Sequence, residues 1–159
     1  MHSENHNKLF LVCPFCQIEH QIMRQFGEVF FCTAPASYSN MDELFLQSLY
    51  HLIMQEDINE LYLVEDKGCS LLQSSMDSDS GYHFLQNIHQ MKSASDDIHT
   101  WAEKLIDDQM EKLQSLDFIQ ERVSAGRLSL YTISLDPNGK QFIARKNGKK
   151  WDSGLLSAT

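Results

Sequence analysis

The stretch Lys8-Leu9-Phe10-Leu11-Val12-Cys13 decides the fold, because an uninterrupted apolar run of this length predicts a strand that is buried on both faces. Two similar runs follow, E-V-F-F-C at residues 28–32 and E-L-Y-L-V at residues 60–64. Apolar side chains at helical spacing predict helices between these strands, over residues 17–26 and 41–55. Strands that alternate with helices indicate an α/β fold with a mainly parallel sheet flanked by helices.

The second half of the chain predicts two more helices and an edge hairpin. Asp96 or Asp97 is suited to cap a long helix over residues 98–116, as Asn40 or Ser39 is for the helix over 41–55. The polar segment 76–95 is weakly patterned, with a short helix at 82–91, and its role stays open. The remaining expected elements are a helix at 117–125, a strand at 127–135, a turn at Asp136-Pro137-Asn138-Gly139 and a returning strand at 140–145.

Length and charge limit the classes of function. A chain of 159 residues with 42% hydrophobic residues fits one domain, 1–159, with residues 1–7 and 146–159 as loose tails. Thirteen Lys and Arg against 22 Asp and Glu give a net charge of −9, which repels phosphate groups. We therefore expect no nucleic-acid binding and no binding to anionic membranes. Since no apolar run reaches the roughly 18 residues of a membrane span, we expect a cytoplasmic protein.

Four cysteines are candidates for chemistry: Cys13, Cys16, Cys32 and Cys69. In a cytosolic chain they are read as buried thiols, metal ligands or redox groups before disulfides. Functional groups of an open α/β sheet lie beyond the carboxyl ends of its strands. Cys13, Cys32 and Cys69 all stand at or just past such ends. We interpret Cys32 as a core thiol.

The positions of Cys13 and of Asp66-Lys67-Gly68-Cys69 resemble a known family. The β-class carbonic anhydrases place one zinc-binding cysteine in C-x-D-S-R after the first strand and another in H-x-x-C after the third. Their closing helix and strand resemble Glu121-Arg122-Val123 and Gly126-Arg127-Leu128-Ser129-Leu130. The resemblance covers about residues 8–144. It implies a sheet in the order 2-1-3-4 with an edge strand or hairpin, a zinc-dependent lyase (carbonate dehydratase) and a homodimer, for which Phe30-Phe31 and residues 34–38 would suit the partner surface.

The site departs from the family pattern at several positions, among them Ser70 in place of the glycine after the second cysteine and residues 32–36 in place of the R-N-A-G-N loop. Phe15 replaces the aspartate and Gln17 the arginine of C-x-D-S-R, while Asp66 replaces the histidine of H-x-x-C. The resemblance then implies zinc held by Cys13, Asp66 and Cys69, with Cys16, His20 or water as the fourth ligand.

Such a ligand set would alter the chemistry of the metal. Two thiolates and a carboxylate around Zn²⁺ carry a net charge of about −1, against about zero for the family's set, so the metal is a weaker Lewis acid. We expect a zinc-binding protein with weak or changed hydratase or lyase activity toward a small substrate such as CO₂ or bicarbonate.

Two alternatives stay open, and with them the question of whether the chain is an enzyme. The chain can be a metal-free, non-catalytic pseudoenzyme that acts as a binding module. It can also be a thiol-disulfide oxidoreductase, because Cys13-Pro14-Phe15-Cys16 resembles the active site of glutaredoxins, where a helix N-terminus lowers the pKa of the first cysteine. The facing cis-proline loop of that fold has no counterpart, since Pro35 comes too early and Pro137 lies in a turn.

Overall fold

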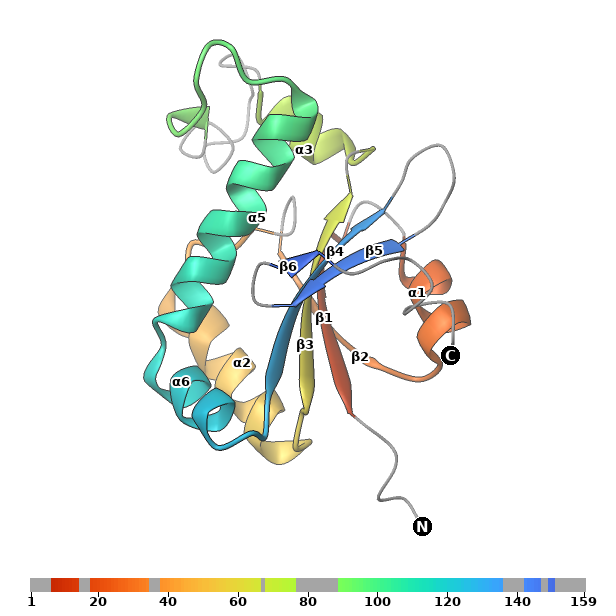
Figure 1. Ribbon diagram of the computed structural model, residues 1–159, viewed down its shortest axis with the longest axis vertical. Coiled ribbons are helices and arrows are strands. Elements are labelled where there is room, and N and C mark those ends of the chain that lie inside the picture. The colour runs from red at the N-terminus through yellow and green to blue at the C-terminus, as the bar shows by residue number, and fades with distance from the viewer. Residues whose placement is uncertain are drawn as a thin grey trace.

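The computed structural model describes residues 7–14, 18–34, 38–66, 68–76, 89–135, 142–146 and 149–150. Within them one sheet has the strand order β2-β1-β3-β4-β5-β6. Helices α2, α5 and α6 lie on one side of the sheet and α1 lies on the other (Figure 1). The strands are β1 (Lys8–Val12), β2 (Phe30–Thr33), β3 (Glu60–Asp66), β4 (Ser129–Leu135), β5 (Phe142–Lys146) and β6 (Lys149–Lys150). The helices are α1 (Glu19–Phe26), α2 (Glu43–Gln55), α3 (Ser70–Ser74), α5 (Ile98–Gln114) and α6 (Asp117–Ser124).

Strand β1 lies inside the sheet, between β2 and β3, and pairs with both in parallel. Leu9 is opposite Phe30 on one side and opposite Leu61 on the other. β3 continues the parallel set to β4, and β5 then runs antiparallel to β4. The predicted order 2-1-3-4, with a hairpin at the edge, is therefore confirmed.

Each face of the sheet packs against its own set of helices, because successive side chains of a strand point to opposite faces. Leu11 and Leu63 pack with residues of α2, α5 and α6. Phe10 and Tyr62 face α1, and their rings stack with centroids 4.5 Å apart. β1 and β3 are thereby buried on both faces, as their apolar runs predicted. The run at residues 28–32 predicts a buried strand too, but β2 is an edge strand and its residues are at most partly buried, because no strand pairs with its outer side among the described residues.

The helix termini agree with the sequence analysis at some positions and differ at one. Asp97 caps α5 by accepting a hydrogen bond from the Thr100 amide at 2.8 Å. Helix α2 is capped by Asp42, which accepts from the Phe45 amide at 2.8 Å, so the predicted cap at Asn40 or Ser39 is wrong. The reason is that the Ser39 hydroxyl instead accepts from the Met41 amide, at 3.0 Å, before the helix begins.

Some sequence predictions fall on residues outside the described part. The turn at residues 136–139 and most of the helix predicted at 82–91 are among them, as are residues 1–6 and 151–159. Lys149–Lys150, which the sequence analysis assigns to a loose tail, pair with β5. Among the described residues, no helix is both long and apolar enough to span a membrane.

We predict that Leu63→Ala lowers the free energy of unfolding by about 2–5 kcal/mol, because a cavity remains at the centre of the sheet. Leu63 is 0% exposed and lies on β3, which is paired on both sides. Leu44→Ala is the matched control, since Leu44 is 76% exposed and its truncation costs less than about 0.5 kcal/mol. Urea unfolding of both variants measures the difference, and equal losses would contradict the burial of β3.

Candidate metal and thiol site

The candidate site lies at the carboxyl ends of β1 and β3. These strands are adjacent and parallel, so the residues that follow them meet at the same edge of the sheet. Cys13 directly follows β1, and Cys69 is the residue before α3. α3 lies at the upper end of β3, beside α5 (Figure 1). The structure therefore brings together two of the three main ligands predicted from the sequence.

The sulfur atoms of Cys13 and Cys69 lie 3.6 Å apart. This is much longer than a disulfide bond, which is about 2.05 Å. Two sulfurs that each lie about 2.3 Å from one tetrahedral zinc ion are about 3.8 Å apart. The spacing of these two sulfurs thus fits a pair of ligands to one zinc ion, and both side chains are buried, at 1% and 3% exposure.

The two cysteines differ in their bonding. Cys13 has a free thiol, so a Cys13–Cys16 disulfide of the glutaredoxin type is not formed in this structure. Cys69 is in a disulfide, and its partner cysteine lies outside the described residues. Cys32 is free as well and packs, half-buried, against the core next to α2, where burial raises the pKa of its thiol. Its position agrees with its interpretation as a core thiol.

Asp66, the third predicted ligand, is the last residue of β3 and has a different contact. Its Oδ1 accepts a hydrogen bond from the Gly68 amide at 3.0 Å, while its carbonyl accepts from the Cys69 amide at 3.0 Å. Asp66 therefore closes the turn that leads into Cys69. Burial raises the pKa of the Asp66 carboxyl, and the bond from Gly68 opposes this rise.

No third ligand joins the two sulfurs within the part of the chain that the structure describes. There, no group of three or more His, Cys, Asp or Glu side chains could hold a metal ion. His20 is exposed on α1. Cys16, with Phe15 and Gln17, lies outside the described residues. Among the described residues, the candidate site therefore has two sulfur atoms and no complete set of zinc ligands.

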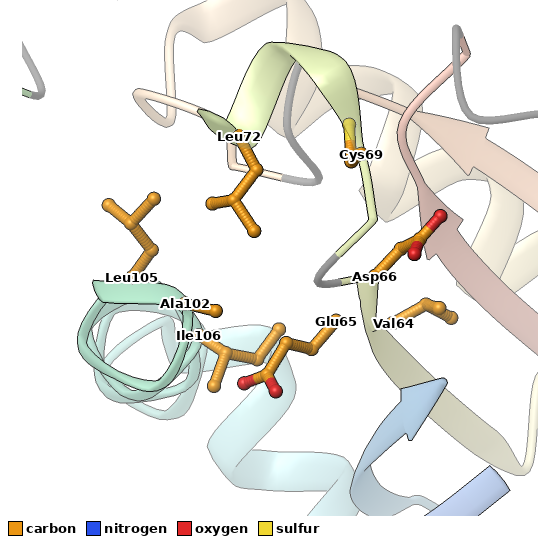
Figure 2. Close-up of a pocket in the computed structure, with 8 residues that line it drawn as sticks. All are labelled: Val64, Glu65, Asp66, Cys69, Leu72, Ala102, Leu105 and Ile106. Carbon is orange, nitrogen blue, oxygen red and sulfur yellow. The ribbon is translucent and has the colours of Figure 1, made fainter. Parts of the chain in front are cut away.

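A small cavity adjoins Cys69, between β3 and α5. Its volume for the centre of a water molecule is about 10 Å³, which is room for about one water. The Glu65 side chain points into this space beside Ala102 and Ile106, whereas the Asp66 carboxylate points away from it (Figure 2). The lining residues are Val64, Glu65, Asp66, Cys69, Leu72, Ala102, Leu105 and Ile106.

Glu65 is the residue of this region that the sequence analysis missed. Its side chain is only 8% exposed, and its Oε1 accepts a hydrogen bond from the Ser134 hydroxyl at 2.9 Å. The signal in the sequence was a carboxylate directly after the apolar residues 61–64 and still within the strand. A buried carboxylate needs such a donor, because an unpaired charge in the interior is costly.

The helix that follows Cys69 is held in place by Trp101 of α5. The indole Nε1 of Trp101, which is 0% exposed, donates to the Ser75 hydroxyl at 2.6 Å. That hydroxyl in turn donates to the Leu72 carbonyl at 2.5 Å. Trp101 also packs in one apolar cluster with Cys13 and Cys69. Apolar side chains therefore surround the sulfur pair, which is nearly inaccessible to solvent.

Tyr38, which lies in the segment before α2, also packs against the two cysteines. Its ring packs in the cluster of Cys13 and Cys69, and its hydroxyl donates to the Asp108 carboxylate of α5. Lys112 donates to the same hydroxyl at 2.6 Å and is paired with Asp108 at 3.1 Å. Burial, followed by the bond to Asp108, raises the pKa of the Tyr38 phenol. These polar groups fix the segment before α2 to α5.

Comparison with known proteins identifies similar structures. No protein-family model and no curated protein sequence matches the chain. The wild-type β-carbonic anhydrase CafD of Aspergillus fumigatus has a TM-score of 0.70 and 12% identity over 87% of this chain and 88% of its own. A tetrameric β-carbonic anhydrase from Sordaria macrospora has a TM-score of 0.71 and 13% identity, covering 92% and 83%. The Coccomyxa β-carbonic anhydrase in complex with acetazolamide has a TM-score of 0.68 and 15% identity, covering 97% and 79%.

Proposed function

We propose that this chain, whose fold is that of the β-carbonic anhydrases, is a zinc-binding protein with weak or changed hydratase or lyase activity toward a small substrate such as CO₂ or bicarbonate. The distance of 3.6 Å between the sulfurs of Cys13 and Cys69 is the observation that supports zinc binding most directly. Both cysteines have the residue type and the strand-end position of the family ligands. In this proposal both act as thiolates, so Cys69 has to be reduced.

Asp66 is the third and weakest ligand in this proposal. To bind a metal beside the two sulfurs, its carboxylate has to give up the bond from the Gly68 amide. A carboxylate is also shorter than an imidazole, so it reaches less far from the end of β3. A fourth ligand would come from Cys16, from His20 after a movement of its exposed side chain, or from water.

When bound, zinc would supply Lewis-acid chemistry to a small substrate. The chain's own residues then limit the rate. Phe15 and Gln17 stand where the family has a carboxylate and a guanidinium, and neither can fix the orientation of a reacting group through charge-assisted hydrogen bonds. The cavity beside Cys69 has room for about one water molecule. Slow turnover is the expected consequence.

A metal-free binding module is the second candidate function. It is favoured by the contact between Asp66 and Gly68, because this carboxylate already has a structural partner. It is favoured also by the lack of a third ligand near the sulfurs among the described residues. Metal analysis of the reduced protein separates the two candidates.

We predict that Asp66→His raises zinc affinity by roughly tenfold or more, about 1.4 kcal/mol, because a neutral imidazole suits Zn²⁺ beside two thiolates and removes one negative charge. Competition with a chromophoric chelator under reducing conditions measures the affinity. Glu111→His, on the exposed side of α5, is the matched control for an added imidazole and should leave the affinity unchanged. Absence of zinc from both the reduced wild type and Asp66→His would rule out the metal site.

We predict that stopped-flow CO₂ hydration is slow in zinc-loaded wild type and stays slow in Asp66→His. Turnover should rise only when Phe15→Asp and Gln17→Arg are added, because these restore the carboxylate and guanidinium that position reacting groups. Phe15→Asn with Gln17→Met, in the same Asp66→His background, has similar side-chain sizes without the charges and is the control. Rapid hydration by the wild type would contradict weak activity.

We propose that the chain forms a homodimer, and we predict a dimer in sedimentation velocity at micromolar concentration. Two observations support it: β2 is an edge strand, and its residues Phe30 and Phe31 are only half-buried. Edge strands with apolar side chains readily pair with a second chain. A dilution series checks the prediction, and a monomer throughout would contradict it.

A further inference from the structure

Apart from the two cysteines, the apolar cluster around Cys13 and Cys69 has one buried member among the described residues that lies outside a helix. This is Tyr38, in the segment before α2. The other buried members belong to α3 and α5. Tyr38 is 3% exposed and Cys13 is 1% exposed. A movement of Tyr38 can therefore expose the Cys13 thiol without unfolding a helix or a strand.

The hydroxyl of Tyr38 is held by two charged side chains of α5. It donates to the Asp108 carboxylate and accepts from the Lys112 ammonium at 2.6 Å. The Lys112 Nζ also lies 4.8 Å from the centroid of the Tyr38 ring. The Asp108 and Lys112 side chains are 32% and 42% exposed and pair with each other at 3.1 Å. Because both are partly exposed, water can replace the hydroxyl when the ring moves away, and neither charge is left buried without a partner.

The next residue, Ser39, is held more firmly than Tyr38. The buried Gln109 carboxamide, in the orientation that satisfies both of its polar atoms, accepts from the Ser39 amide and donates to the Ser39 carbonyl, each at 3.1 Å. The Ser39 hydroxyl accepts from the Met41 amide at 3.0 Å. Met41 has a φ of 60°, a left-handed conformation that persists only where surrounding contacts hold it. Ser39 is therefore a fixed point about which Tyr38 can turn.

We propose that Tyr38 is a gate over the Cys13 thiol, closed by its hydroxyl bonds to α5 and opened when the ring swings away about Ser39. The open state admits small molecules that react with or bind to a thiol. The gate acts on the free thiol of Cys13 alone, so it requires neither a metal ion nor a particular bond at Cys69. Hydrogen bonds to charged partners are stronger than neutral ones, so loss of the hydroxyl should favour the open state by roughly tenfold or more.

The test measures the rate at which iodoacetamide alkylates Cys13 in the full, folded chain, read by peptide mass spectrometry. Tyr38→Phe keeps the ring and removes the hydroxyl, so we expect the rate to rise by roughly tenfold or more. Lys112→Met removes one of the two partners of that hydroxyl and should give a smaller rise. Tyr50→Phe is the matched control: Tyr50 is 42% exposed on α2, and loss of its hydroxyl should leave the rate at the wild-type value.

Two further measurements separate the gate from a general loosening of the protein. Hydrogen exchange at the Ser39 amide should be as slow in Tyr38→Phe as in the wild type, because Gln109 still holds this amide. Leu63→Ala weakens a different cluster of the core and should raise the Cys13 rate less than Tyr38→Phe does. An unchanged rate in Tyr38→Phe, or an equal rise in Leu63→Ala, would overturn the gate. Fast exchange at Ser39 in Tyr38→Phe would overturn it as well, because the whole segment would then be unfolding.

Discussion

β1 and β3 pair in parallel, with Leu9 opposite Leu61 and Leu11 opposite Leu63, and this pairing places Cys13 and Cys69 at the same edge of the sheet. Parallel neighbours end together, so residues far apart in the chain meet beyond their carboxyl ends. The two cysteines are 56 positions apart in the sequence, but their sulfur atoms lie only 3.6 Å apart. If β1 were an edge strand or paired in another register, the two sulfurs would not meet.

The apolar enclosure of the pair determines what chemistry it can support. Cys13 and Cys69 pack with Tyr38, Trp101 and Leu105, and both are nearly inaccessible to solvent. Burial disfavours an isolated thiolate, because the charged form loses its hydration. A cation between the sulfurs offsets that cost by pairing with the charge, and a disulfide avoids it by removing the charge.

The end of β3 carries two carboxylates that serve different purposes. Glu65 points toward α5 and is bonded to Ser134 of β4, whereas Asp66 points to the other side and bonds Gly68 (Figure 2). They diverge because neighbouring residues of a strand face opposite sides of the sheet. Asp66 matches the family's third ligand only in the resemblance of residues 66–69 to H-x-x-C, and its present contact with Gly68 closes the turn that precedes Cys69. If Asp66 bound a metal, its carboxylate would have to give up the hydrogen bond from the Gly68 amide that stabilises this turn.

Sequence alone determined the sheet and its helices, because apolar runs such as residues 60–64 must be buried on both faces and the helical spacing of residues such as Trp101 requires one buried face. It also placed Cys13 and Cys69 at strand ends, and the resemblance supplied the order 2-1-3-4. Tertiary structure decided the rest. The cap at Asp42, the donor Ser134 for Glu65 and the contact of Asp66 with Gly68 depend on side-chain directions in loops and on a partner 69 residues away in the chain. The bond between Ser134 and Glu65 is set by where β3 and β4 pack together, which no local pattern of residues encodes. The partners of Asp42 and Asp66 are local, but several polar residues nearby could have made such bonds, and only the final side-chain directions select among them.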